Sequence, residues 1–469
     1  MLFTSIEFLF LFLPLVMAGH ILLPSRYGLR NAWLLAASLA FYAWGEPAFV
    51  LAMLASIVFN YAAALCEETA RRSGLRRASA CIFAVGVAGN LALLGTWKYA
   101  NFATSVLREW FPSLKGAVPQ TSFLLPIGIS FFTFQAISYL ADARRGAAPV
   151  QRNPLSLALY IALFPQLIAG PIVRYADFLG QIAGRRVTMD GFYGGMLRFL
   201  VGFNKKMLVA NTLAEVADAA FARQGISVCG AWLGAVAYTF QIYYDFGGYS
   251  DMAIGLGRMF GFRFPENFNC PYLSGSATEF WRRWHMTLGG WFRDYVYIPL
   301  GGSRLGKVRM LANLAVVWTL TGLWHGANWT FILWGAFYGV LIAAEKLTRL
   351  PERIERSRTL AVLSHPLTLL AVVCGWVLFR ADSLPAACAY LGAMFGSDGA
   401  PAIDGFCVFW FREAAVFLVV AAAGCLPRPA RLRGLSATGF FAVAQVVLFA
   451  VGVSCLVMKS HNPFIYFNF

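Results

Sequence analysis

The chain has 469 residues, of which 59% are hydrophobic and 13% charged, and its formal net charge is +16. A soluble protein of this length is closer to half apolar and a quarter charged, so the composition excludes an ordinary soluble domain. The apolar residues come in blocks of roughly membrane-spanning length, about 20 residues. Lys and Arg stand between these blocks, as in cytoplasmic loops, and not in a basic stripe interleaved with stacking aromatics. The sequence therefore predicts a multi-pass membrane protein in a lipid bilayer and argues against nucleic-acid binding.

Several kinds of site find no support in the residue pattern. The nine cysteines are scattered singly, without a CxxC pair or a Cys/His metal spacing, so we expect no metal ligands. The GxxxxGK[ST] motif of phosphate-binding loops is absent. The segment 248–252, Gly-Tyr-Ser-Asp-Met, lacks the closing glycine of a nucleophile elbow.

Thirteen apolar blocks follow one another along the chain. They cover residues 6–23, 31–44, 48–65, 81–97, 123–140, 155–169, 194–209, 230–244, 311–323, 330–344, 367–378, 414–426 and 440–457. Some are short for a full crossing, and such segments survive in a bilayer only when they are buried against other protein or line a wet cavity. We therefore expect an all-α polytopic fold with about 11–13 transmembrane or re-entrant helices. No linker or repeat divides the chain, which predicts a single membrane domain over residues 1–469.

Basic clusters after the first, third and fifth blocks indicate a topology. They are Arg26 and Arg30; Arg71, Arg72, Arg76 and Arg77; and Arg144, Arg145 and Arg152. Two spans separate each cluster from the next, so all three loops can lie on the cytoplasmic side. This arrangement predicts that the N-terminus lies outside. The first block lacks a basic n-region and is expected to be an uncleaved span.

Polarity breaks the apolar pattern between residues 241 and 328, the predicted catalytic core. Ionisable groups at membrane depth cost on the order of several kcal/mol unless they are paired or hydrated, so we interpret them as functional. The candidate site residues are two histidines and the polar or aromatic residues around them: Asp245, Tyr249, Asp251, Arg282, Arg283, Trp284, His285, Arg293, Asp294, Trp324, His325 and Asn328.

The first histidine motif follows a helix start. Ser276 and Glu279 form a capping box, which predicts that a helix begins at Ser276. On that helix Glu279, Arg282 and His285 are spaced by three and are expected to share one face. The segment is too short and polar to span a membrane, so a re-entrant or interfacial helix that carries His285 inward fits better.

The second histidine motif ends an apolar block. His325 stands between Trp324 and Gly326, which predicts an aromatic wall on one side and an open side on the other. Burial would keep the imidazole neutral and able to accept a proton, as a general base must. The charged neighbours leave alternatives open. Asp245 and Asp251 are helix caps or partners for Arg.

These motifs resemble a known family. The segments that carry the resemblance are 244–257, 264–269, 279–285, 291–295, 298–302 and 322–326, with 125–135, 164–171, 376–380 and 463–467 further out. They are similar to the bacterial branch of the membrane-bound O-acyltransferase family, most of all to the membrane subunits of alginate O-acetylation. Relatives acetylate cellulose or peptidoglycan, or carry D-alanine toward teichoic acids. By position, His325 matches the family's catalytic histidine and His285 its second active-site histidine.

The resemblance implies a mechanism and a set of partners. Helices would surround a central tunnel in the bacterial inner membrane, and acetyl-CoA from the cytoplasm would be the donor, with no permanently bound cofactor. His325 would take the acceptor hydroxyl's proton, and His285 or Asn328 would stabilise the oxyanion. Arg282, Arg283 and Arg293 would either bind the donor's phosphates or pair with Glu279 and Asp294. An extracytoplasmic acetyltransferase with a serine nucleophile would relay the acetyl group to a polysaccharide such as alginate, cellulose or peptidoglycan.

Two functions from other classes remain as alternatives. A transporter would move a solute without covalent chemistry and is typically built from two related halves, for which the sequence has no internal symmetry. A non-catalytic scaffold would only hold a biosynthetic complex together. A His325→Ala substitution separates the three, because only an acyltransferase needs that imidazole.

Overall fold

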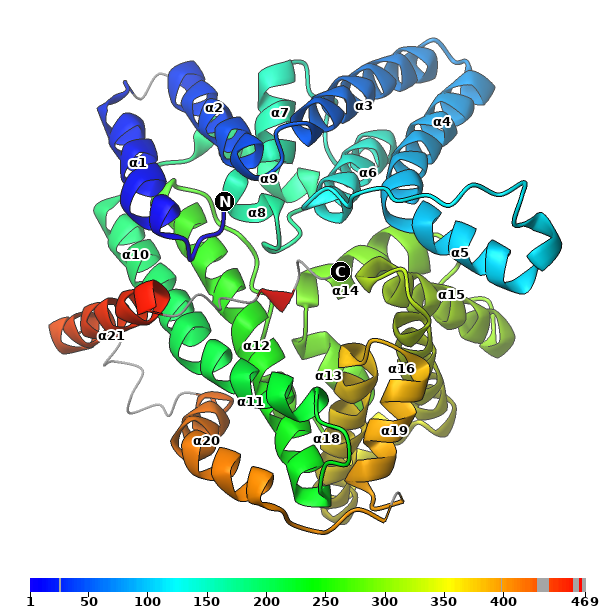
Figure 1. Cartoon of the computed structure of the whole chain (residues 1–469). Helices are drawn as coiled ribbons and strands as arrows, with labels where there is room; N and C mark the ends of the chain where they lie inside the picture. Colours follow the sequence, from blue (N-terminus) through cyan, green and yellow to red (C-terminus); the bar gives the residue numbers. More distant parts are fainter. Residues whose placement is uncertain (25–26, 398, 428–437, 459–463, 466–469) are drawn as a thin grey trace. The chain divides into compact units, whose positions relative to one another are not determined.

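A computed structural model describes residues 1–24, 27–397, 399–427, 438–458 and 464–465. These residues form helices and connecting loops, with no β-strand among them, so the predicted all-α class is confirmed (Figure 1). The helices group into two compact units, each of which is described by itself. Unit 1 comprises Met1–Met196 and Met252–Pro265, and unit 2 comprises Leu197–Asp251 and Glu266–Phe469.

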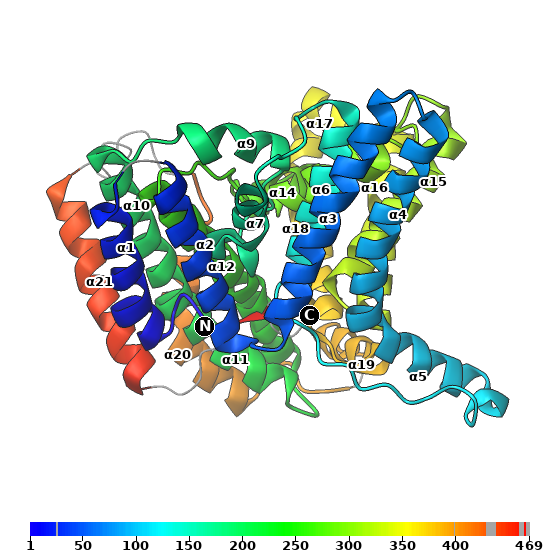
Figure 2. The ribbon, with the colours of Figure 1, turned by 90° about the horizontal axis from the view of Figure 1, so that it is seen from above.

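Unit 1 is built from the N-terminal helices. They are η1 (Phe8–Phe12), α1 (Leu13–Leu22), α2 (Tyr27–Gly45), α3 (Phe49–Arg72), α4 (Arg76–Leu94), η2 (Gly95–Tyr99), α5 (Ala100–Trp110), η3 (Pro112–Leu114), α6 (Ile129–Arg145), α7 (Pro154–Ala162), α8 (Phe164–Leu167), α9 (Tyr175–Gly184) and the start of α10 (Met189–Asn204). The helices α3, α4 and α6 pack on one another, with the turn between α3 and α4 at one end of the unit (Figure 2).

Two of the predicted basic loops meet in unit 1. Arg144, in the last turn of α6, donates to the carbonyl of Ser79 at 2.9 Å, and Arg152 forms an ion pair with Glu68 of α3. The loop after α6 therefore lies beside the turn between α3 and α4, as a shared side of the membrane requires. Arg26, in the first predicted basic loop, lies outside the described residues.

Six helices among the described residues are long and apolar enough to cross a membrane. They span Phe49–Arg72, Arg76–Trp110, Trp329–Thr348, Arg358–Arg380, Gly405–Gly424 and Gly439–Met458, and shorter apolar helices cover Phe8–Leu22 and Leu384–Met394. The predicted blocks 123–140 and 155–169 instead form helices that are short or preceded by a loop, α6, α7 and α8, and such segments need protein around them at membrane depth. The chain is a multi-pass membrane protein.

Unit 2 contains both histidine motifs. Its elements are the rest of α10, η4 (Lys205–Ala210), α11 (Asn211–Phe221), most of α12 (Val228–Met259), η5 (Pro271–Leu273), α13 (Ala277–Arg283), α14 (Met286–Phe292), η6 (Arg293–Tyr297), α15 (Lys307–His325), α16 (Trp329–Thr348), α17 (Leu350–Arg356), α18 (Arg358–Arg380), α19 (Leu384–Met394), α20 (Gly405–Gly424) and α21 (Gly439–Met458).

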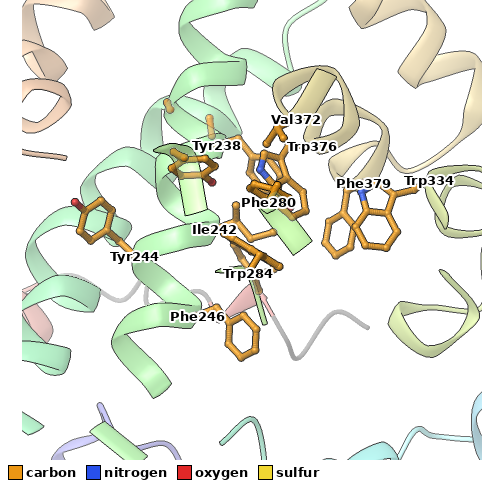
Figure 3. Packing of buried hydrophobic residues seen from close by; sticks show 14 of the residues in the cluster. Tyr238, Ile242, Tyr244, Phe246, Phe280, Trp284, Trp334, Val372, Trp376 and Phe379 are labelled. Atoms are coloured by element: carbon orange, nitrogen blue, oxygen red, sulfur yellow. The ribbon is translucent and has the colours of Figure 1, made fainter. Parts of the chain in front are cut away.

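An aromatic cluster forms the core of unit 2 (Figure 3). The ring centroids of Trp284 and Trp376 are 4.8 Å apart, and those of Trp334 and Phe379 are 5.1 Å apart. Lipid is as apolar as these side chains, so inside a bilayer the close packing of the rings, and not their removal from water, holds such a cluster together. Trp284, one of the candidate site residues, is a buried member of this core.

Close approach of α15 and α16 fixes the helix that ends at His325. A Cβ atom on Gly322 would lie 2.3 Å from the carbonyl oxygen of Phe331, and one on Gly335 would lie 2.3 Å from that of Trp318. Both contacts are with backbone, which cannot yield as a flexible side chain does. Glycine at both positions therefore lets the two helices touch, as small residues do in other membrane bundles.

Enlarging Gly335 is expected to push α15 away from α16. We expect Gly335→Val to lower the free energy of unfolding by about 1–3 kcal/mol, the usual cost of overpacking. Thermal unfolding in detergent measures the effect. The control is Gly405→Val, because a Cβ at Gly405 meets no described atom within 4 Å. Equal stability of the two variants would contradict the close packing.

Candidate functional site

The helix before His285 starts as the sequence predicts. Ser276 is the N-cap of α13, and its hydroxyl oxygen accepts a hydrogen bond from the backbone N–H of Glu279 at 3.1 Å. The Glu279 carboxylate returns to the N–H of Gly275 at 2.9 Å. A second carboxylate, Glu345 at the end of α16, accepts the N–H groups of the first two helical residues at 2.6 and 2.8 Å. Three of the N–H groups that a helix start leaves open are thus satisfied, and α13 is anchored to α16.

His285 does not share a helix face with Glu279, so that prediction is wrong. The helix α13 ends at Arg283, and Trp284 is extended, with φ −101° and ψ 131°. His285 itself has φ +43°, in the left-handed region. An L-residue there costs roughly 1–2 kcal/mol, so surrounding contacts have to hold His285 between α13 and α14. Sequence spacing alone could not locate this break.

Asn267 provides those contacts. Its side-chain oxygen lies 3.0 Å from Nδ1 of His285 and accepts from the N–H and the hydroxyl of Thr287 at 3.3 and 2.9 Å. Its backbone carbonyl accepts the N–H of Met286 at 2.9 Å. Because the N–H of Thr287 can only donate, the atom that faces it is the amide oxygen, and Nδ1 of His285 must carry a proton to share that oxygen. The neutral ring then presents Nε2 as a hydrogen-bond and proton acceptor.

His325 is the last residue of α15, as the apolar block predicts. Its ring is enclosed by aromatics: the centroid distances are 4.9 Å to Trp324, 5.0 Å to Trp334 and 5.2 Å to Phe379. The expected open side at Gly326 is wrong, because a Cβ there would lie 2.3 Å from the ring of Phe331. The imidazole is only 3% exposed.

The Trp324 ring contacts both histidines. Its ring centroid is 5.7 Å from that of His285 and 4.9 Å from that of His325, with interplanar angles of 61° and 81°. The histidines of two separate sequence motifs are therefore both in contact with the same indole ring. Phe246 of α12 also packs against His285, with 4.7 Å between the two ring centroids.

The acidic candidates of α12 are bound to basic residues. Asp245 is buried and pairs with Nζ of Lys206 at 2.7 Å. Its second oxygen accepts the backbone N–H of Ile465 at 2.9 Å, and Tyr249, one turn along, stacks on Phe464 at 4.8 Å. Residues 464 and 465, which the structure describes, are thus held at this ion pair, while the other residues of segment 463–467 lie outside the described residues.

The second acidic candidate of α12, Asp251, joins a larger network. Its two oxygens lie 2.6 Å from Arg198 and 2.7 Å from Lys205. Arg198 also pairs with Glu266 at 2.6 Å. Asp251 is therefore a partner for Arg, one of the two roles left open by the sequence, whereas Asp245 pairs with a Lys and fills neither role.

Breaking the buried pair on one side is expected to be costly. Lys206→Met leaves the Asp245 carboxylate without its cation, so the free energy of unfolding should fall by about 3–5 kcal/mol. The double variant Asp245→Asn/Lys206→Met removes both charges and should recover much of that loss. Denaturant unfolding in detergent measures both variants. A double variant less stable than the single one would show that the charges matter individually and not as a pair.

Comparison with known proteins identifies the chain. The sequence profile described as the membrane-bound O-acyltransferase family matches residues 96–351. The chain belongs to the membrane-bound O-acyltransferase family. It is 48% identical over 398 residues to the probable alginate O-acetylase AlgI of Azotobacter vinelandii, covering 84% of this chain and 78% of that protein. It is 42% identical to the Pseudomonas putida protein of the same name, over the full length of both. It is 34% identical to the peptidoglycan O-acetyltransferase of Helicobacter pylori, covering 85% and 80%. The chain is a membrane O-acyltransferase.

The remaining basic candidates of this acyltransferase divide between pairing and exposure. Arg283 pairs with Glu279 at 2.9 Å and Arg293 with its neighbour Asp294 at 2.7 Å. Arg282 is exposed on the short helix α13. Pairing, one of the two readings that the sequence allowed, is therefore observed for Arg283 and Arg293.

Asn328 has a structural position in the acyltransferase. Its side-chain oxygen caps α16 by accepting the N–H of Thr330 at 3.2 Å, and its amide group donates to the carbonyl of Asp382 at 3.1 Å. Both ends of the side chain are engaged in holding the start of α16 directly after His325. This geometry suits a positioning residue better than a donor to an oxyanion.

Sequence reasoning missed Asn267 and Lys206. Lys206 had a signal, because it and Lys205 interrupt an apolar block, where a charge is expensive. They begin η4, a π-helical turn, an irregularity that is frequent at functional sites. Asn267 stands in segment 264–269, which carries part of the family resemblance, but nothing singled it out within that segment, since an Asn in a loop that contains Pro265 is ordinary turn chemistry. Among the described residues, no group of three or more His, Cys, Asp or Glu side chains could hold a metal ion.

Proposed function

We propose that this acyltransferase moves acetyl groups from cytoplasmic acetyl-CoA for the O-acetylation of an extracytoplasmic polysaccharide. The observation that carries the proposal is the pair of buried imidazoles, His285 and His325, on one indole. The names of the relatives, alginate O-acetylase and peptidoglycan O-acetyltransferase, support an acetyl group and a cell-surface polymer. Alginate-like polymers, cellulose and peptidoglycan are the acceptor polymers that we consider.

His325 acts as the general base. Its position at the end of α15 is fixed by the contact of that helix with α16, and the rings of Trp334 and Phe379 pack against its imidazole. In the reaction the acceptor hydroxyl loses its proton to His325 while its oxygen attacks the thioester carbonyl. The tetrahedral oxyanion then expels the thiolate, which takes the proton from His325 and leaves as the free thiol.

His285 acts as an acceptor and not as a neutral oxyanion donor. Its Nδ1 proton is committed to Asn267, so Nε2 orients a hydroxyl or takes up a proton. The oxyanion needs a different N–H group. Trp334 is a candidate, because its ring contacts that of His325 and its indole N–H finds no hydrogen-bond acceptor among the described residues. A buried donor of this kind stabilises a developing negative charge more than one in water.

Access to the histidines requires a side chain to move. His285 is 1% exposed and His325 is 3% exposed, and the Trp324 ring contacts both. We propose that rotation of the Trp324 indole opens the passage through which donor and acceptor meet. This passage is the central tunnel of the proposal. The ion pairs of Asp245, Asp251, Arg283 and Arg293 stabilise its walls. The other residues that we assign to the walls are Tyr249, Arg282, Trp284, Asp294 and Asn328.

The location follows from the same proposal. The chain lies in the bacterial inner membrane with its N-terminus outside, supported by the two basic loops that meet beside α3 in unit 1. A polysaccharide is a poor fit for a passage inside a bilayer. The direct acceptor is therefore an extracytoplasmic acetyltransferase whose serine nucleophile receives the acetyl group and passes it to the polymer.

The experiment measures thioester consumption and polymer acetylation separately. Proteoliposomes with the full chain receive acetyl-CoA, labelled in its acetyl group, on one face, together with the extracytoplasmic partner on the other. We expect free coenzyme A on the first face and labelled partner on the second. Label that crosses as intact acetyl-CoA indicates a transporter. Cells in which a His325→Ala chain sustains normal polymer acetylation indicate a scaffold, and either result overturns the proposal.

A further inference from the structure

Four arginines converge on one pocket in unit 1. The pocket has a volume of about 580 Å³ and lies between the end of α9, the start of α10 and the end of α12. Arg185, Arg186, Arg258 and Arg263 line it together with Gln181 and Thr188, and no carboxylate is among its lining residues. This volume is within the range of roughly 300–1,000 Å³ that is typical of small-molecule sites.

Arg185 is fixed at the base of this pocket. It donates to the carbonyls of Phe260 and Ile182 at 3.1 and 2.9 Å, and its guanidinium lies 4.2 Å from the ring centroid of Phe262. These two carbonyl oxygens would otherwise repel an anion, and the hydrogen bonds from Arg185 offset their negative charge. Burial, together with the positive charge of Arg30, lowers the pKa of Arg185 to about 10, so the group stays charged at neutral pH.

Four arginines elsewhere in unit 1 have carboxylate partners. Arg71 and Arg144 pair with Glu67 at 3.5 Å, and Arg72 and Arg152 pair with Glu68. By contrast, the four pocket arginines form no ion pair within the part of the chain that the structure describes. A preference for basic residues in cytoplasmic loops explains how many arginines there are. It does not explain why these four face one hollow without a counter-charge.

We propose that this pocket binds a phosphate-bearing ligand, either the headgroup of an anionic phospholipid or the phosphate groups of a soluble compound such as coenzyme A. The planar guanidinium fork matches two phosphate oxygens at once, and several forks around one hollow select a ligand with more than one negative charge. Gly180 and Gly184 also line the pocket, and a Cβ at either position would meet no described atom within 4 Å, which leaves room for a bulky headgroup. The site lies in unit 1 and is additional to the histidines of unit 2.

A matched pair of double variants tests the site. Arg186→Gln/Arg263→Gln removes two exposed pocket charges, and Arg76→Gln/Arg77→Gln removes two exposed charges at the start of α4. Detergent-purified full chain is titrated with inorganic pyrophosphate and with coenzyme A by calorimetry. The same chain is then taken up in nanodiscs of phosphatidylcholine with phosphatidylglycerol, and the lipid that it retains is measured by native mass spectrometry.

The pocket variant should bind at least one probe about tenfold more weakly than the wild-type chain and the control variant, as expected for lost charge-assisted hydrogen bonds. Weaker pyrophosphate or coenzyme A binding assigns the site to a soluble ligand, and weaker phosphatidylglycerol retention assigns it to a lipid. Equal binding by both double variants, or no saturable binding of any probe to the wild-type chain, overturns the proposal. Because no acyl transfer is measured, a chain that binds these probes but transfers no acetyl group would overturn the proposed function alone.

Discussion

Replacing His325 with alanine is expected to lower the rate of acetyl transfer by roughly 10²–10⁴-fold, the range that a positioned general base contributes. Without the imidazole, no other group in the aromatic enclosure of Trp324, Trp334 and Phe379 takes the hydroxyl proton. The measurement is the initial rate of label transfer from acetyl-CoA in proteoliposomes. A second variant, His325→Gln, keeps a polar side chain of similar reach but removes the basic nitrogen, and should lose the same activity.

His365 provides the matched control for that substitution. It lies in α18 of unit 2, and its Nδ1 is 3.2 Å from the carbonyl of Ser274, outside the aromatic enclosure. His365→Ala should therefore keep nearly the wild-type rate. A His325→Gln variant as active as the wild-type chain would show that the ring acts through packing, and the assignment of a general base would be wrong.

Replacing Asn267 with leucine is expected to lower the rate on the order of 10²-fold. Leucine has a similar volume but cannot accept from Nδ1, so His285 is free to adopt the tautomer that turns a proton, and not a lone pair, toward the reaction. Loss of the correct tautomer costs about 10⁴-fold where the partner is a carboxylate, and a neutral amide should matter less. The effect should appear in kcat with little change in KM, because substrate binding does not depend on the tautomer.

Two further variants separate this role from a loss of structure. Asn267→Asp keeps an acceptor for Nδ1 and for Thr287 and should restore most of the rate. Asn269→Leu makes the same change two positions along the same loop, where the residue is exposed, and should be nearly silent. A rate in Asn267→Asp as low as in Asn267→Leu would mean that the hydrogen bond does not set the tautomer.

The sequence predicts local structure well where one short motif decides it. Ser276 and Glu279 form the expected cap, and α15 ends at His325 as the apolar block indicates. The end of α13 could not be predicted, because it depends on Asn267 holding His285 in a left-handed conformation from 18 positions away. Likewise, Gly335 is unremarkable in the sequence until α15 lies against it.

The candidate site shows the same division. Ionisable residues such as His325, Asp245 and Asp251 can be recognised in the sequence, because such residues are rare in apolar segments, where burying them costs free energy. Their partners do not, because ion pairing is decided by packing between distant segments. Asp251 meets Arg198 and Lys205 only after α10 has packed beside α12, and no spacing in the sequence specifies that contact.

The hydrogen bond between Ile465 and Asp245 has a consequence for biosynthesis. The two residues are 220 positions apart in the chain. During translation, Lys206 and Asp245 are therefore synthesised long before Ile465, whose backbone N–H donates to Asp245. A chain that is truncated before Ile465 keeps the ion pair of Asp245 with Lys206, but its Asp245 carboxylate lacks the hydrogen bond from Ile465.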